Sequence, residues 1–198
     1  MDNLVLWILR SIESEERRKN LMRHILVLSG LLMAIVSQLR AEDTPLQTVP
    51  YVDLGRYVGT WYEIATIPQR FQKDCVVVTA TYTLRDDGAI AVLNKCRKKT
   101  LDGELKEAKG KAWIVDKKTN AKLKVRFFWP FKGDYWIIEL DADYQYAVVG
   151  HPGREYLWIL CRTPQMEESL YQDLLQRIAN KGYDLSLIKR TLQPLKTN

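Results

Sequence analysis

Residues that form reactive centres are scarce in this chain of 198 residues, which contains two histidines and three cysteines. His24 lies in an N-terminal segment that we expect to be removed, which leaves only His151, beside a Pro-Gly turn. A single histidine does not make a histidine-rich metal site. The sequence also shows no G-x-S-x-G motif and no Ser-His-Asp arrangement. It therefore predicts no catalytic residue, no metal ion and no cofactor.

An apolar run long enough to span a bilayer comfortably is also missing. The main candidate runs from Ile25 to Val36 and follows the basic segment Met22-Arg23-His24. A basic start, a short apolar stretch and a small residue before a polar start are typical of a secretory signal peptide. We expect residues 1–41 to be an N-terminal extension plus signal, cut near Ala41, and the mature protein to be exported. The alternative is an amphipathic helix that packs on the domain.

Charge of one sign is not concentrated enough to indicate nucleic-acid binding. The net charge is +6, and the basic residues are spread through the chain, with local clusters at 95–99 and 117–118. No nucleic-acid motif accompanies them. Solvated strand ends explain such clusters, but a basic rim that approaches anionic lipid head groups is an alternative. An envelope membrane surface is therefore kept as a candidate partner, and a homodimer is left open.

The chain is rich in short segments with the pattern of β-strands. A polar segment with two prolines, 42–50, is predicted to be a linker. Tight turns such as Arg85-Asp86-Asp87-Gly88 separate the strand-like segments and favour antiparallel hairpins. Many short strands joined in this way predict an up-and-down barrel, in which closure removes exposed sheet edges. The expected strands are 61–67, 76–84, 89–95, 106–115, 122–128, 135–140, 146–150 and 156–161.

The pattern changes to a helical period after Pro164. Leu170, Leu174, Leu175 and Ile178 recur at helical spacing, which predicts one amphipathic helix. Gly182 is a suitable residue to end it. We expect this helix to pack outside the barrel.

Three sequence blocks resemble the signature of the lipocalin family. The first is Gly59-Thr60-Trp61-Tyr62-Glu63-Ile64-Ala65, the second spans residues 141–149, and the third spans residues 156–164. Within the family, the chain is most similar to the bacterial lipoprotein lipocalins of the Blc type and to apolipoprotein D. The resemblance implies that Arg162 packs across Trp61 at the closed end of the barrel.

The resemblance also implies the fold class and the domain limits. We expect an all-β, eight-stranded up-and-down antiparallel lipocalin β-barrel over residues 51–194, with one C-terminal α-helix packed outside and a tail at 195–198. The bacterial subgroup carries a lipidated cysteine directly after its signal. The first cysteine here is Cys75, so we expect no lipid anchor of that kind.

The barrel interior is the expected ligand site. On the hairpin around Asp87, alternation places the apolar residues of both strands on one face, which we expect to face inward. The registers of the family extend this assignment to the other strands. Side chains that only fill the core are the alternative. The predicted ligand-binding residues are Val78, Ala80, Tyr82, Ile90, Val92, Ala112, Leu123, Val125, Phe127, Tyr135, Ile137, Tyr156 and Trp158.

Cysteines are the only reactive candidates outside the predicted signal. The hairpin brings Cys75 and Cys96 close together but diagonal, so a disulfide between them requires an irregularity in the strand. That pairing is left open. We expect Cys161 to point outward, under the helix.

The resemblance implies a non-enzymatic carrier, located in the periplasm, that stores or transports fatty acids or lysophospholipids in the bacterial cell envelope, for membrane maintenance under stress. The alternative is a thiol-dependent isomerase that uses Cys75 or Cys96 on a lipid held in the barrel. The aromatic run Phe128-Trp129-Pro130-Phe131 is a candidate lid, membrane contact or partner surface.

Overall fold

A computed structural model describes residue 22 and residues 44–195. The chain divides into two compact units, Met1–Thr44 and Pro45–Asn198, and the fold belongs to the second unit. Apart from Met22, the predicted signal peptide lies outside the described residues, so its cleavage stays a prediction. None of the helices in the described part is long and apolar enough to cross a membrane.

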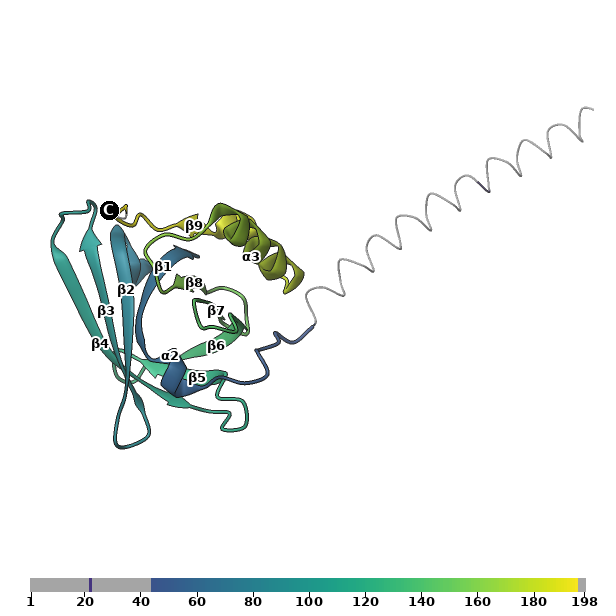
Figure 1. Cartoon of the computed structure of the whole chain (residues 1–198), viewed down its shortest axis with the longest axis horizontal. Coiled ribbons are helices and arrows are strands. Elements are labelled where there is room, and N and C mark those ends of the chain that lie inside the picture. The colour runs from purple at the N-terminus through teal and green to yellow at the C-terminus, as the bar shows by residue number, and fades with distance from the viewer. Residues whose placement is uncertain (1–21, 23–43, 196–198) are drawn as a thin grey trace, which may run out of the picture. The chain divides into compact units, whose positions relative to one another are not determined.

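Eight antiparallel strands form a closed barrel (Figure 1). Strands that follow one another in the chain pair with one another, and the ring closes because β1 pairs with both β2 and β8. This arrangement confirms the predicted up-and-down lipocalin barrel. The strands are β1 (Gly59–Thr66), β2 (Cys75–Leu84), β3 (Ile90–Lys98), β4 (Leu105–Ile114), β5 (Lys122–Arg126), β6 (Gly133–Leu140), β7 (Tyr146–Gly150) and β8 (Leu157–Cys161).

The two ends of the barrel differ, and we name them the floor and the mouth. The short helix α2 (Leu54–Tyr57) precedes β1 and lies at the floor. Because successive strands run in opposite directions, the β2–β3, β4–β5 and β6–β7 connections also lie at the floor. The connections 67–74, 99–104, 127–132 and 151–156 therefore lie at the mouth.

The floor hairpin between β2 and β3 follows the predicted turn chemistry. Gly88 has a φ of 73°, which a residue without a Cβ adopts readily. The Asp87 carboxylate accepts a hydrogen bond from the backbone N–H of Ala89 at 3.1 Å. The turn sets the register in which Leu84 lies opposite Ile90. As a result, alternate residues of both strands share the inner face.

The helix α3 (Glu168–Asn180) packs outside the barrel, as predicted (Figure 1). Leu174 and Ile178 are fully buried in an outer core, together with residues of β7 and β8 that point away from the interior. Gly182, with a φ of 85°, follows the helix and donates a backbone hydrogen bond to the carbonyl of Ala179 at 2.8 Å. This closes the last turn.

Part of the segment predicted to be a linker packs against the barrel. Leu46 is buried in the outer core. Val49 donates its backbone N–H to the carbonyl of Ile137 at 3.0 Å. The ordered contacts of the domain thus begin before residue 51.

A C-terminal strap, residues 189–193, fills a gap between β1 and β2. These two strands pair only from Gly59 opposite Tyr82 to Tyr62 opposite Thr79. Beyond that point the two-residue strand β9 (Lys189–Arg190) pairs with β1.

The rest of the strap bonds to both strands. The backbone N–H of Val77 donates to the carbonyl of Leu192 at 2.8 Å. The Gln193 side chain donates to the carbonyls of Glu63 and Val78, at 2.9 Å each. Sequence analysis did not predict β9, because two residues carry no periodicity.

Candidate functional site

Trp61 and Arg162 form the centre of the floor. Trp61 is fully buried, and its indole N–H donates to the carbonyl of Tyr57 at 2.8 Å. The guanidinium carbon of Arg162 lies 3.7 Å from the centroid of the Trp61 ring. Gly59 has a φ of 98°, and a Cβ there would lie 3.2 Å from an Arg162 nitrogen. The glycine therefore permits both the turn into β1 and the close approach of Arg162.

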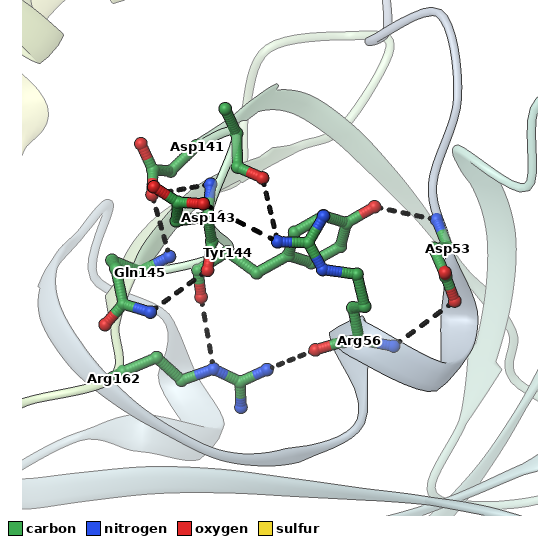
Figure 2. A network of polar contacts seen from close by, with 8 residues as sticks. Asp53, Arg56, Asp141, Asp143, Tyr144, Gln145 and Arg162 are labelled. Atoms are coloured by element: carbon green, nitrogen blue, oxygen red, sulfur yellow. Dashed lines mark hydrogen bonds and ion pairs between the residues drawn. The ribbon is translucent and has the colours of Figure 1, made fainter.

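A polar network joins Arg162 to the β6–β7 turn and to α2 (Figure 2). The Asp141 carboxylate accepts the backbone N–H groups of Asp143 and Gln145, at 3.1 Å each. The Tyr144 hydroxyl accepts the N–H of Asp53 at 2.8 Å, and its carbonyl accepts from Arg162 at 3.2 Å. The three sequence blocks that carry the family resemblance thus meet at one place.

Most of the predicted ligand-binding residues belong to one interior cluster. This cluster also contains floor residues such as Val52, Tyr57 and Trp61, which are almost completely buried. The predicted residues in the cluster are Ala80, Tyr82, Ile90, Val92, Ala112, Leu123, Val125, Phe127, Tyr135, Ile137 and Trp158.

Two predicted residues are placed differently. Val78 is buried but lies outside the interior cluster, and its carbonyl bonds to the C-terminal strap. Tyr156 precedes β8, is 37% exposed, and its ring lies 6.3 Å from that of Trp158. The last strand begins one residue later than predicted. Tyr156 therefore belongs to the connection at the mouth and not to the strand.

The interior is accessible toward the mouth. Ala80, Val125, Phe127, Tyr135 and Trp158 pack against the interior cluster, yet each is only partly buried. Since strand alternation directs the side chains of this face inward, we infer that the surface they leave exposed borders the interior or its opening. By contrast, the floor is sealed. The barrel is therefore a cup with an apolar lining.

Three tyrosine hydroxyls form a chain inside this cup. Those of Tyr57 and Tyr135 are 2.7 Å apart, and Tyr135 donates to Tyr82 at 2.9 Å. Burial raises the pKa of Tyr82 to about 12 and the pKa of Tyr57 and Tyr135 well above the ordinary value. All three phenols are therefore neutral at physiological pH. Sequence analysis missed Tyr57, because it lies in α2, outside the strand alternation.

Asn94 is a second polar group on the inner face that sequence analysis missed. It lies opposite Ala80 and Ala108, in the same alternation as Val92 and Ile90. Its Oδ1 atom is buried and has no hydrogen-bond partner among the described residues. The alternation that predicts an inward-facing Val92 also predicts an inward-facing Asn94 when it is extended by two residues.

A second polar chain lies at the mouth, around the buried Glu63. The Trp158 indole donates to the Gln72 side chain at 3.2 Å, and Gln72 donates to the Glu63 carboxylate at 2.9 Å. Thr191 of the strap donates to the other carboxylate oxygen. Burial raises the pKa of the Glu63 carboxyl group, and these hydrogen bonds partly oppose the shift. Beside it lies an open cavity of about 480 Å³ between residues 63–76 and the strap.

The cysteines form one bridge and one free thiol. A disulfide joins Cys75 to Cys96, with the Cα atoms 5.5 Å apart. The register of β2 against β3 shifts between Val76 and Thr79, and Val77 has a φ of 52°. This is an irregularity of the kind that the pairing requires. Cys161 is buried in the outer core, under α3. The described residues contain no group of His, Cys, Asp and Glu side chains that would hold a metal ion.

Exposed aromatic side chains gather on the mouth connections. Phe128, Trp129 and Phe131 are between 71% and 82% exposed, and Phe71 on the β1–β2 connection is similarly exposed. Strand β5 ends at Arg126 rather than at residue 128 as predicted, which places Phe128, Trp129 and Phe131 outside the sheet.

Comparison with known proteins agrees with this geometry. Residues 52–193 match the model of the lipocalin-like domain. Temperature-induced lipocalin-1 of Arabidopsis thaliana is 44% identical over 161 residues, which cover 77% of this chain and 85% of that protein. The outer membrane lipoprotein Blc of Escherichia coli K12 is 43% identical over 157 residues, covering 78% and 88%. Mouse apolipoprotein D is 33% identical over 151 residues, covering 71% and 77%.

Solved structures support the fold. Insecticyanin from the tobacco hornworm Manduca sexta superimposes with a TM-score of 0.59 at 20% identity, over 75% of this chain and 84% of that one. Proteins of this family generally bind small hydrophobic ligands in the barrel and are generally not enzymes. The matched domain model and the identity to Blc and apolipoprotein D show that the chain belongs to the lipocalin family.

Proposed function

We propose that this protein is a non-enzymatic carrier of single-chain lipids, fatty acids or lysophospholipids, which it stores or transports in the cell envelope. The observation that carries the proposal is the cup itself, with a sealed floor, an apolar lining and partly exposed residues toward the mouth. Such a site suits a long apolar tail with a polar head at the opening. The name of the Blc relative as an outer membrane lipoprotein supports the envelope as the place of action.

The mouth also has the composition of a membrane-contact surface. The exposed aromatic residues of 127–132 and Phe71 stand next to the exposed cations Arg70, Lys73 and Lys132. Aromatic side chains enter the interfacial region of a bilayer, and basic residues are attracted to anionic head groups. Contact at this end would present the opening of the cup to the lipid that it collects.

The structure does not favour the isomerase alternative. The two sulfur atoms that it would use, those of Cys75 and Cys96, are bonded to each other. The thiol of Cys161 lies in the outer core, away from the lining of the cup. A thiolate nucleophile in the barrel is therefore not part of the proposal.

A chain-length series tests the proposal. Each methylene that leaves water contributes about 0.8 kcal/mol, or roughly fourfold in affinity, before the costs of binding. Affinity for fatty acids should rise with chain length and level off when the tail reaches the floor. Titration calorimetry measures this directly. No binding at any chain length would overturn the carrier function.

Paired tryptophan variants locate the site. Ala80→Trp places a bulky ring on the inner face of β2, so we expect binding to be lost. Thr83→Trp is the matched control, because Thr83 is exposed and points outward on the same strand. Val77 is unsuitable as a control, since its φ is 52° at the strand irregularity. Equal affinities of the two variants would show that the ligand does not occupy the barrel.

A further inference from the structure

The three tyrosine hydroxyls at the bottom of the cup hold one more proton than they use. Each phenol supplies a single donor. Tyr135 donates to Tyr82, so the contact between Tyr57 and Tyr135 is donated by Tyr57. The proton of Tyr82 is left over, and no other hydrogen bond of this hydroxyl is present within residues 44–195. Reversing the direction of both hydrogen bonds only moves the unused proton to Tyr57, because two hydrogen bonds use two of the three donors.

The surroundings make this unused donor costly. Tyr82 is buried, and its neighbours on the inner face include Val92 and Ala80. A buried hydroxyl that lacks a partner loses its hydrogen bonds to water without replacement. Burial also keeps the phenol protonated, since it raises the pKa of Tyr82 to about 12. The donor therefore persists throughout the physiological pH range.

The tyrosines lie where the inner end of a ligand would arrive. The ring centroids of Tyr57 and Trp61 are 5.1 Å apart, and Tyr82 lies opposite Gly59, the first residue of β1. Both facts place the three hydrogen-bonded tyrosines directly above the floor. Tyr135 is only partly buried and packs against the interior cluster, so the group borders the interior.

From these contacts we infer that the floor of the cup is a binding subsite for a neutral oxygen atom, a hydroxyl or carbonyl, at the inner end of the ligand tail. The inference rests on the proposed carrier function and specifies its ligand as an oxygenated lipid. A carboxylate suits the subsite less well. Arg162, the cation whose charge acts on Tyr57, lies against the Trp61 ring and directs its N–H groups to backbone carbonyls, and an unpaired charge in an apolar site is unfavourable.

A matched pair of ligands tests the subsite: a saturated fatty acid of the length at which affinity levels off, and its ω-hydroxy counterpart. A purely apolar floor would lower the affinity for the ω-hydroxy acid. An unused phenol donor at the floor would raise it, because it can form a hydrogen bond with the hydroxyl. We expect the ω-hydroxy acid to bind about 3- to 10-fold more tightly, the size of one net hydrogen bond. Calorimetry on the unmodified protein measures the ratio.

Variants separate the tyrosines from other causes. In Y57F/Y82F/Y135F no phenol remains, so the preference should reverse. In Tyr82→Phe the preference should persist, because the proton of Tyr135 then becomes the unused one. If the triple variant fails to fold, an infrared measurement on the unmodified protein replaces this test. The carbonyl stretch of a bound ω-oxo fatty acid should then lie at lower frequency than in an apolar solvent.

The outcomes distinguish the two proposals. Binding of the plain acid with no advantage for the ω-hydroxy acid would overturn the subsite, because water would then serve the phenol equally well, and would leave the carrier function intact. An unshifted carbonyl band would overturn the subsite in the same way. Failure of both acids to bind would overturn the carrier function itself, and the subsite with it.

Discussion

Replacement of Arg162 by alanine should weaken the fold more than any other single change at the surface of the floor. The guanidinium donates five hydrogen bonds to backbone carbonyls, those of Arg56, Tyr57, Val58, Thr60 and Tyr144. Three of these carbonyls follow one another at the end of α2, where helical partners are missing. The same group covers the face of the Trp61 indole at 3.7 Å.

The expected loss follows from these contacts. A cation–π contact contributes up to about 2 kcal/mol when it is desolvated. Hydrogen bonds to a charged group contribute about 1.5–3 kcal/mol, but bonds that share one donor group are not additive. We therefore expect Arg162→Ala to lose roughly 3–5 kcal/mol of unfolding free energy. For comparison, Trp61→Ala should cost a similar amount through the cavity that it leaves.

Urea unfolding followed by circular dichroism measures this loss. With a slope of about 1–3 kcal/mol per molar urea, the midpoint should fall by at least about 1 M. Arg162→Lys keeps the charge but loses the planar guanidinium group, so its urea midpoint should lie between those of the parent and Arg162→Ala. Arg70→Ala, an exposed arginine at the other end, is the control and should change stability by less than about 0.5 kcal/mol. An unchanged midpoint for Arg162→Ala would refute the role assigned to the floor.

Four further predictions concern other parts of the chain. Removal of the disulfide, which closes a loop over a sequence separation of 21 residues, should lower the free energy of unfolding by about 3 kcal/mol in urea titrations of the double alanine variant. Burial raises the folded-state pKa of the Glu63 carboxyl group, so its contribution to stability is present below the unfolded-state pKa and is lost as pH rises through the folded-state pKa. The urea midpoint of Glu63→Gln minus that of the parent should therefore increase as pH rises above the ordinary carboxyl pKa, and a constant difference would contradict this. Trp129→Ser/Phe131→Ser should reduce co-sedimentation with anionic phosphatidylglycerol vesicles, whereas Val115→Ser, at an exposed apolar residue of the β4–β5 connection at the floor, should not. The mature protein should begin near Glu42, and N-terminal sequencing that recovers the first residues of the chain would contradict cleavage there.

The sequence predicted the barrel well because its signals are local. Turn chemistry at Asp87-Gly88 and the alternation of apolar residues in β2 and β3 are fixed by neighbours in the chain. The meeting of Trp61 with Arg162 is a long-range contact, and it was predicted only through the resemblance to lipocalins.

The polar interior was harder to predict. Tyr57 reaches the tyrosine chain from a short helix, so no strand periodicity marks it. Glu63 is buried where the strap covers it with Thr191, which lies 128 residues away in the sequence. Contacts of this kind depend on the path of the chain in three dimensions, which neither propensity nor periodicity specifies.

The strap also constrains how the chain matures during synthesis. Near the start of the domain, Ile64 and Val77 form backbone hydrogen bonds with Thr191 and Leu192, which lie near its end. Until residues 189–193 have been synthesised, the mouth ends of β1 and β2 keep unpaired edges that face each other, and such edges are prone to pair with other chains. These two edges are therefore protected later than the rest of the barrel. A truncation before residue 189 should leave a slit beside Glu63, whatever the state of the other strands.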